Sequence, residues 1–180
     1  MTEPTGARVL GPNDGKAGLL GSIGVRFMLA GAETGGGFSL VEHPMPPRAL
    51  AAPLHRHTHE DEYSFVLEGR VGALLGDEVV YGEVGDLIFK PRAQWHTFWN
   101  DGDGAARILE IISPAGFERY FEEMVDLLEG PGPPDPNELG AVAARHGLEV
   151  DRDSIPRLTE EYGLTFGPQT PRPRSDQGSE

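Results

Sequence analysis

One short segment of the chain carries three alternating histidines followed by acidic residues. Its sequence over residues 55–62 is HRHTHEDE. In an extended strand, residues two apart face the same side, with their Cα atoms about 6–7 Å apart. A His-x-His pair therefore directs two imidazoles into one space, where a single divalent metal can bridge nitrogens at about 2.0–2.1 Å. The spacing predicts a metal site on a strand.

The spacing alone leaves open which histidines would bind the metal. His55 and His57 form one pair, and His57 and His59 form another, with Glu62 closer behind it. Glu62 has the opposite parity on a straight strand, so it can reach the metal only after a turn, from the following strand. His96 is a candidate fourth ligand from a more distant strand.

Many short strands are expected around this segment. The 180 residues include 25 Gly and 16 Pro, and a chain so rich in turn formers favours short strands over long helices. The segments that read as strands are 22–30, 38–42, 49–59, 63–68, 70–75, 78–81, 87–90, 96–99 and 107–112. This pattern is typical of an all-β sandwich or barrel. The sequence HPMPP at 43–47 is expected to break regular structure, which places His43 in a loop.

The pattern becomes helical after Pro114. Residues 117–128 have apolar side chains at helical spacing, and further helices are expected at 137–146 and from 153 or 154 to 162. The aromatic residues of the first helix are expected to pack it on the outside of the barrel, or alternatively to lie over the barrel mouth as a lid.

These patterns predict four parts of the chain. We expect a flexible arm at 1–17, a β-barrel at 18–114, a helical extension at 115–166 and a disordered tail at 167–180.

Composition excludes several classes of partner and site. With 15 Lys and Arg against 29 Asp and Glu, the net charge of −14 disfavours nucleic acid and anionic membranes as partners. The absence of cysteine excludes disulfides, thiolate metal sites and thiol nucleophiles. Without an apolar run of about 18 residues or a signal-peptide core, we expect a soluble cytoplasmic protein.

Two segments resemble the paired sequence motifs of the cupin superfamily. Residues 55–69 have the spacing H-x-H-x4-E-x6-G of the first motif, with Ala49 where a leading Gly is usual. Residues 85–100 have the spacing G-x5-P-x4-H-x3-N of the second motif, with Ala93 where a middle Gly is usual. The helices and the Pro-rich connector that follow resemble single-domain bacterial cupins of the quercetinase-like group.

The resemblance implies an all-β fold, namely a cupin double-stranded β-helix (jelly-roll barrel) with a C-terminal α-helical extension. It implies one divalent transition metal per chain, held by His55, His57, Glu62 and His96, with His59 beside the site or outside it. Three nitrogens and one carboxylate suit Fe, Mn, Ni, Co, Cu or Zn. It also implies a homodimer.

The function implied by the resemblance is a metal-dependent dioxygenase that acts on a small oxygenated aromatic or enol substrate. Glu62 is then both a metal ligand and a candidate catalytic base. Ser64 and Val66 are small and share the face of Glu62, which leaves room for a substrate pocket, and Phe98 could form its wall. Two alternatives stay open: a metal-dependent isomerase, cyclase or lyase that needs no O₂, and a non-catalytic cupin that binds a small molecule.

Overall fold

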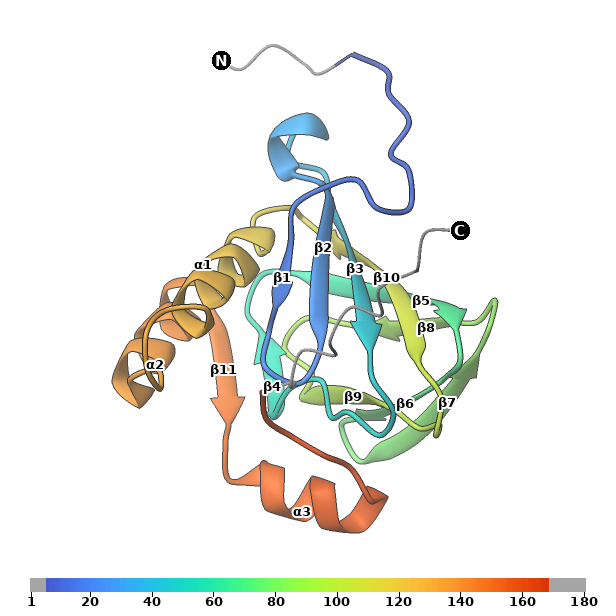
Figure 1. The fold of residues 1–180 in the computed structure, drawn as a ribbon, viewed down its shortest axis with the longest axis vertical. Coiled ribbons are helices and arrows are strands. Elements are labelled where there is room, and N and C mark those ends of the chain that lie inside the picture. The colour runs from blue at the N-terminus through green and yellow to red at the C-terminus, as the bar shows by residue number, and fades with distance from the viewer. Residues whose placement is uncertain (1–5, 169–180) are drawn as a thin grey trace, which may run out of the picture.

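Two antiparallel β-sheets form the body of the molecule, and the three helices come after β10 (Ala106–Ser113) in the chain (Figure 1). The computed structural model describes residues 6–168. The strand order of the larger sheet is β1 (Ala17–Leu19), β2 (Gly24–Leu29), β3 (Ser39–Met45), β10 (Ala106–Ser113), β5 (Asp61–Glu68) and β8 (Leu87–Lys90). The order of the smaller sheet is β11 (Leu148–Asp151), β4 (Leu54–His57), β9 (His96–Asn100), β6 (Arg70–Leu75) and β7 (Glu78–Glu83). The expected double-stranded β-helix is confirmed.

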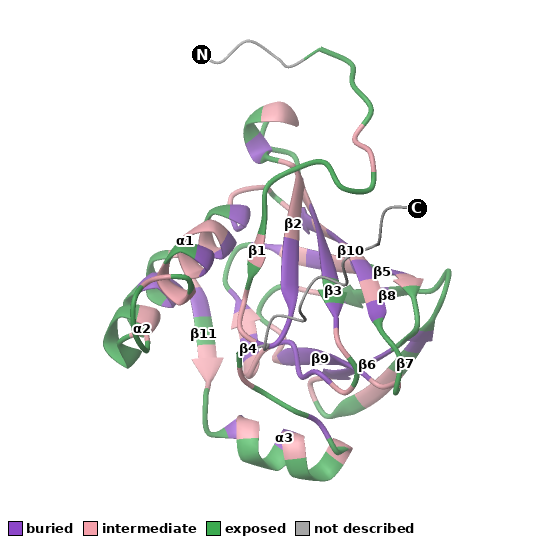
Figure 2. Ribbon diagram, in the orientation of Figure 1, coloured by how far each residue is buried: buried purple, intermediate pink, exposed green. Residues whose placement is uncertain are grey.

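The alternation of side chains along β10 shows how the interior is built. Its buried residues alternate with half-buried ones along the whole strand, so that one face points into the barrel. β3 pairs with one edge of β10 and β5 with the other, which makes β10 central to its sheet. Apolar side chains from the inner faces, such as Val66 and Ile108, form the core between the sheets (Figure 2).

Two expectations about strand boundaries are wrong. The strand ends within the segment 43–47 only after Met45, so His43 lies in β3 and not in a loop. Pro44 lies opposite Arg107 of β10 but beyond the β3 residues that pair with β2, so its missing N–H breaks no bond on the β2 side. The strand expected at 49–59 is only β4, four residues long.

Besides β1, at the end of the expected arm, one strand, β11, was not expected from the sequence. It follows the second helix and pairs with β4 at the edge of the smaller sheet, with Leu148 opposite His57 and Val150 opposite His55. Four residues carry too short an alternation to be recognised without the partner strand. β11 therefore flanks the strand that holds the histidine pair.

The three helices form where the apolar spacing predicts them. They are α1 (Glu118–Leu128), α2 (Pro136–Arg145) and α3 (Ser154–Tyr162), and a short 3₁₀ turn lies at Gly31–Glu33. The side chain of Asp135 accepts a hydrogen bond from the backbone N–H of Asn137 and so caps α2. α3 ends at Gly163, whose φ of 62° is the left-handed conformation that favours glycine. No helix within residues 6–168 has the length and apolarity that a membrane crossing requires.

The aromatic face of α1 covers one end of the barrel. Phe117 and Phe121 are buried among Val41 and Ile112, which belong to the inner faces of β3 and β10. The aromatic stripe therefore lies over the barrel mouth, which is the second of the two expected placements. Of the expected tail at 167–180, residues 169–180 lie outside the described residues, as do residues 1–5 of the expected arm.

The packing of α3 on the barrel generates a stability prediction. Leu158 is fully buried in one apolar cluster with Leu50, Trp99 and Leu164. Leu158→Ala should lower the free energy of unfolding by about 2–5 kcal/mol, because it leaves a cavity between helix and barrel. Urea denaturation would measure this change. Glu160→Ala, at an exposed position of the same helix, is the matched control, and equal stabilities of the two variants would contradict this packing.

Candidate metal centre

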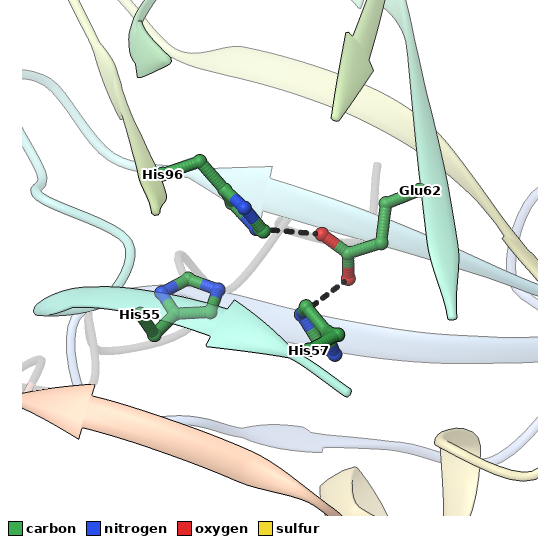
Figure 3. Close-up of side chains that lie close together, drawn as sticks. All are labelled: His55, His57, Glu62 and His96. Atoms are coloured by element: carbon green, nitrogen blue, oxygen red, sulfur yellow. Dashed lines mark hydrogen bonds and ion pairs between the residues drawn. The ribbon is translucent and has the colours of Figure 1, made fainter. Parts of the chain in front are cut away.

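Four buried side chains meet in the interior near the end of the barrel that α1 covers. His55 and His57 come from β4, His96 from β9 and Glu62 from β5 (Figure 3). One potential ligand atom from each residue lies within 4.8 Å of the corresponding atoms of the others. These are the four residues that the resemblance implied, and His59, the member of the rival pair, is exposed. The cluster could hold one metal ion.

Strand pairing explains why residues distant in sequence converge here. His55 lies directly opposite His96 in the pairing of β4 with β9. The chain then reverses after His57, so that Glu62 projects from β5 in the other sheet and reaches across the interior. This reversal removes the parity conflict between Glu62 and the histidines.

Backbone carbonyls fix the orientation of two of the imidazoles. Nδ1 of His55 is 2.8 Å from the carbonyl oxygen of Pro53, and Nδ1 of His96 is 3.0 Å from that of Gln94. Because a carbonyl oxygen only accepts hydrogen bonds, each Nδ1 carries a proton, and Nε2 is the ring atom left for a metal. Nε2 of His96 lies 3.2 Å from Oε2 of Glu62. Such a second interaction is the usual way in which a metal-binding histidine is held.

The ring nitrogens of His57 test whether these residues fit a metal. Neither of its ring nitrogens has a hydrogen-bond partner among residues 6–168, although the side chain is buried. Its Nε2 lies 3.4 Å from Oε1 of Glu62, and its Nδ1 lies 3.8 Å from Oε2 of Glu60. An unpaired buried imidazole is costly. A cation between the imidazole and the Glu62 carboxylate would provide the missing partner, so the residues fit a metal.

The protonation states also suit a metal. Burial, with the neighbouring His96 and His57, holds the pKa of His55 well below its ordinary value, and burial lowers the pKa of His57 to about 4. Burial opposes ionisation of Glu62, but the Lys90 ammonium and the histidines hold its pKa well below the usual range. At neutral pH the imidazoles of His55 and His57 are therefore neutral and Glu62 is a carboxylate, which are the forms that bind metals.

Glu62 belongs to a buried network of charged and polar side chains. Lys90 is 1 % exposed, and its Nζ lies 2.9 Å from Oε2 of Glu62 and 3.0 Å from Oε2 of Glu110. Ser64 donates a hydrogen bond of 2.8 Å to the same Glu110 oxygen. Burial raises the pKa of Glu110 to about 7, against the opposing effect of Lys90. These contacts fix the position of the Glu62 carboxylate.

Lys90 and Glu110 were missed by the sequence analysis. The signal that could have found them is a charged residue at an inward-facing position of an otherwise apolar strand, as in LIFK and RILEII. A charge at such a position must find a partner across the barrel.

A cavity of about 140 Å³ lies beside the quartet. Two members of the quartet, His55 and Glu62, line this cavity, and aromatic side chains of α1 form part of its wall. Of the expected pocket residues, Phe98 lines this cavity. Ser64 and Val66 are not among its lining residues, because Ser64 is bonded to Glu110 and Val66 is packed in the core.

His43 is a further residue of this cavity that the sequence analysis misplaced. It is buried in β3 instead of lying in a loop, and its Nδ1 lies 2.9 Å from the carbonyl oxygen of Gly24. Position 43 shares the inward face of β3 with Val41 and Met45. If the expected strand had been continued past Glu42, this alternation would have predicted that His43 is buried.

Comparisons with known proteins agree with this architecture. Residues 42–112 match the family described as Cupin domain, and no curated protein matches the chain. Pac13, described as a unique nucleoside dehydratase, is 13% identical over 63% of this chain and 88% of its own, with a TM-score of 0.51. A Streptomyces Pac13 variant with uridine is 13% identical over 64% and 88%, also with a TM-score of 0.51. KdgF from Halomonas sp. is 16% identical over 54% and 84%, with a TM-score of 0.49.

At these identities the solved structures show the fold alone. The family match covers residues 42–112, the segment that contains all four residues of the quartet.

Removal of single imidazoles tests the metal site. His55→Ala and His96→Ala should each lower the metal content of the purified protein to a small fraction of the wild-type value, because each removes one nitrogen of the quartet. Elemental analysis after dialysis would measure the content. His59→Ala, an exposed histidine of the same segment, should retain the metal. Full metal content in both quartet variants would contradict the site.

The stability of the metal-free protein should depend on pH. The pKa values of His43 and His57 are lowered to about 4 by burial, so between pH 6.5 and 4 the unfolded chain binds protons that the folded protein does not. Glu110 acts in the opposite sense, because its raised pKa of about 7 lets the folded protein take up one proton. Acidification from pH 7 to 5 should therefore lower the free energy of unfolding, by ~1.4 kcal/mol per pH unit for each net proton.

Urea denaturation at the two pH values would measure this dependence. Glu110→Gln removes the opposing titration and should steepen the loss. Stability that is equal or higher at pH 5 would show that the buried histidines do not behave in this way.

Proposed function

We propose that the protein is a metal-dependent enzyme of the dioxygenase type that acts on a small oxygenated aromatic or enol substrate. The observation that carries this proposal is the buried quartet of three imidazoles and one carboxylate at the border of a cavity with aromatic walls. The Nε2 atoms of the histidines and a Glu62 oxygen would hold the metal. When bound, a divalent transition metal would supply Lewis-acid polarisation of substrate oxygens and, if redox-active, electron exchange with O₂.

The protein residues would orient the substrate and exclude water. Phe98, Phe117 and Phe121 line the cavity and offer flat apolar surfaces to a planar ring. α1 closes the end of the barrel above them. Glu62 borders the cavity as an ionised carboxylate and is placed to accept a proton from a substrate hydroxyl.

The size of the cavity favours a compact substrate. Its volume is about 140 Å³, and an engineered apolar cavity of about 150 Å³ in another protein binds benzene. A compound with one ring therefore fits better than a flavonol with three.

Glu110 favours a second candidate function. A carboxyl group that lines the cavity and has a pKa of about 7 can both donate and accept a proton near neutral pH. With a metal as Lewis acid, this group would suit an isomerase, cyclase or lyase that needs no O₂.

Oxygen consumption distinguishes the two functions. Metal-loaded protein incubated aerobically with simple enediols, diketones and flavonols should take up O₂ with at least one single-ring or smaller compound. Glu62→Gln should slow the reaction by about 100-fold or more, because it removes a ligand and proton acceptor. Glu68→Gln, at an exposed position of the same strand, should leave the rate unchanged. Lack of O₂ uptake with every compound and metal would overturn the dioxygenase, and anaerobic turnover would favour the second candidate.

A further inference from the structure

Two polar side chains line the cavity but do not belong to the metal quartet. They are His43 on β3 and Glu110 on β10. In the pairing of these strands His43 lies opposite Ile108, and Glu110 lies opposite Val41. His43 and Glu110 are therefore diagonal neighbours on the inward face of adjacent strands. Both belong to the larger sheet, whereas the three histidines of the quartet belong to the smaller one.

His43 presents a hydrogen-bond acceptor. Its Nδ1 must carry the proton, because its partner is the carbonyl oxygen of Gly24, which only accepts. Burial lowers the pKa of His43 to about 4, so the imidazole is neutral at pH 7 and its Nε2 has a free lone pair. The ring is held edge-on against Phe121, with a centroid distance of 5.2 Å.

In its ionised form, Glu110 presents a second acceptor. Its Oε2 receives the hydrogen bonds of both Ser64 and Lys90, at 2.8 and 3.0 Å. Its Oε1 is buried and has no hydrogen-bond partner among residues 6–168. If Glu110 served only as a counter-ion for Lys90, one oxygen would remain unpaired in the interior, which is unfavourable.

We propose that His43 and Glu110 form a second recognition site in the cavity, which accepts hydrogen bonds from a hydroxyl group of the bound substrate. The proposal rests on the proposed function, because it assumes that other oxygens of the same substrate bind the metal at the quartet. It narrows the substrate class to single-ring compounds that have two adjacent oxygens at one end and a further hydroxyl elsewhere on the ring.

A pair of ligands that differ by one hydroxyl tests this site without turnover. Zinc-loaded protein, which is redox-inert, is titrated under anaerobic conditions with catechol and with 1,2,4-trihydroxybenzene in a calorimeter. The wild type should bind the trihydroxy compound about tenfold more tightly, as one additional hydrogen bond to a charged or buried acceptor would give.

Two variants locate the origin of that preference. Glu110→Gln replaces the free acceptor by a competing donor, and His43→Phe removes the imidazole acceptor while it fills the same space. Each should bring the ratio of the two affinities close to one, whatever its effect on the affinity for catechol itself. Glu68→Gln, an exposed carboxylate on β5, is the control and should keep the wild-type ratio.

The outcomes separate this inference from the proposed function. Equal affinities of the wild type for both compounds, or a preference that persists in both variants, would overturn the second recognition site and leave the metal-directed binding intact. Absence of binding by either compound would overturn the proposed substrate class and the recognition site with it. Because the wild-type comparison needs no variant and His43→Phe leaves the Lys90 pair intact, poor folding of Glu110→Gln would not prevent a decision.

Discussion

A lysine buried between two carboxyl groups is the interaction on which the interior of this protein depends. Lys90 contacts Glu62 and Glu110 and lies over the ring of Phe98, with Nζ 4.4 Å from its centroid. A charge in such a place is expensive unless it is paired and hydrogen-bonded. Because Lys90 is held on β8, it fixes the carboxylate of Glu62, its opposite residue on β5, where the histidines of the other sheet can reach it.

The two sheets have different chemical roles because of this arrangement. The smaller sheet presents three imidazoles, two of them oriented by backbone carbonyls. The larger sheet presents Lys90 between the carboxyl groups of Glu62 and Glu110, in a network that also includes Ser64. The space between the sheets thus has the metal-binding nitrogens of the quartet on one side and carboxyl oxygens on the other. The aromatic face of α1 closes its end.

Closure by α1 affects the electrostatics as well as the shape. Phe117 packs against the ring of His57, with a centroid distance of 4.3 Å, and Phe121 packs against His43. These contacts exclude water from the imidazoles, and this desolvation is the main cause of their lowered pKa values. The helix α1 follows the barrel strands in the sequence, yet it forms part of the cavity wall. It is also part of the reason that His43 and His57 are neutral.

Local spacing was enough to predict the strands β6 and β8, the three helices and the His-x-His pair, because each depends on a period of two or 3.6 within a few residues. The resemblance to two sequence motifs selected His55 and His57 over the rival pair and grouped them with the candidates Glu62 and His96. Spacing could not identify Lys90, Glu110 or His43, because the role of each is set by a partner on another strand. It also could not predict β11, which is too short to be recognised without β4, or the position of α1 over the barrel mouth.

The sequence by itself determined which residues could bind a metal and which face of each strand they occupy. Only the tertiary structure decided what lies opposite them: the lysine behind Glu62, the acceptors across the cavity and the helix that excludes water. The physical reason is that alternation along a strand fixes the direction of a side chain, whereas its partners depend on the pairing of strands that are far apart in the chain.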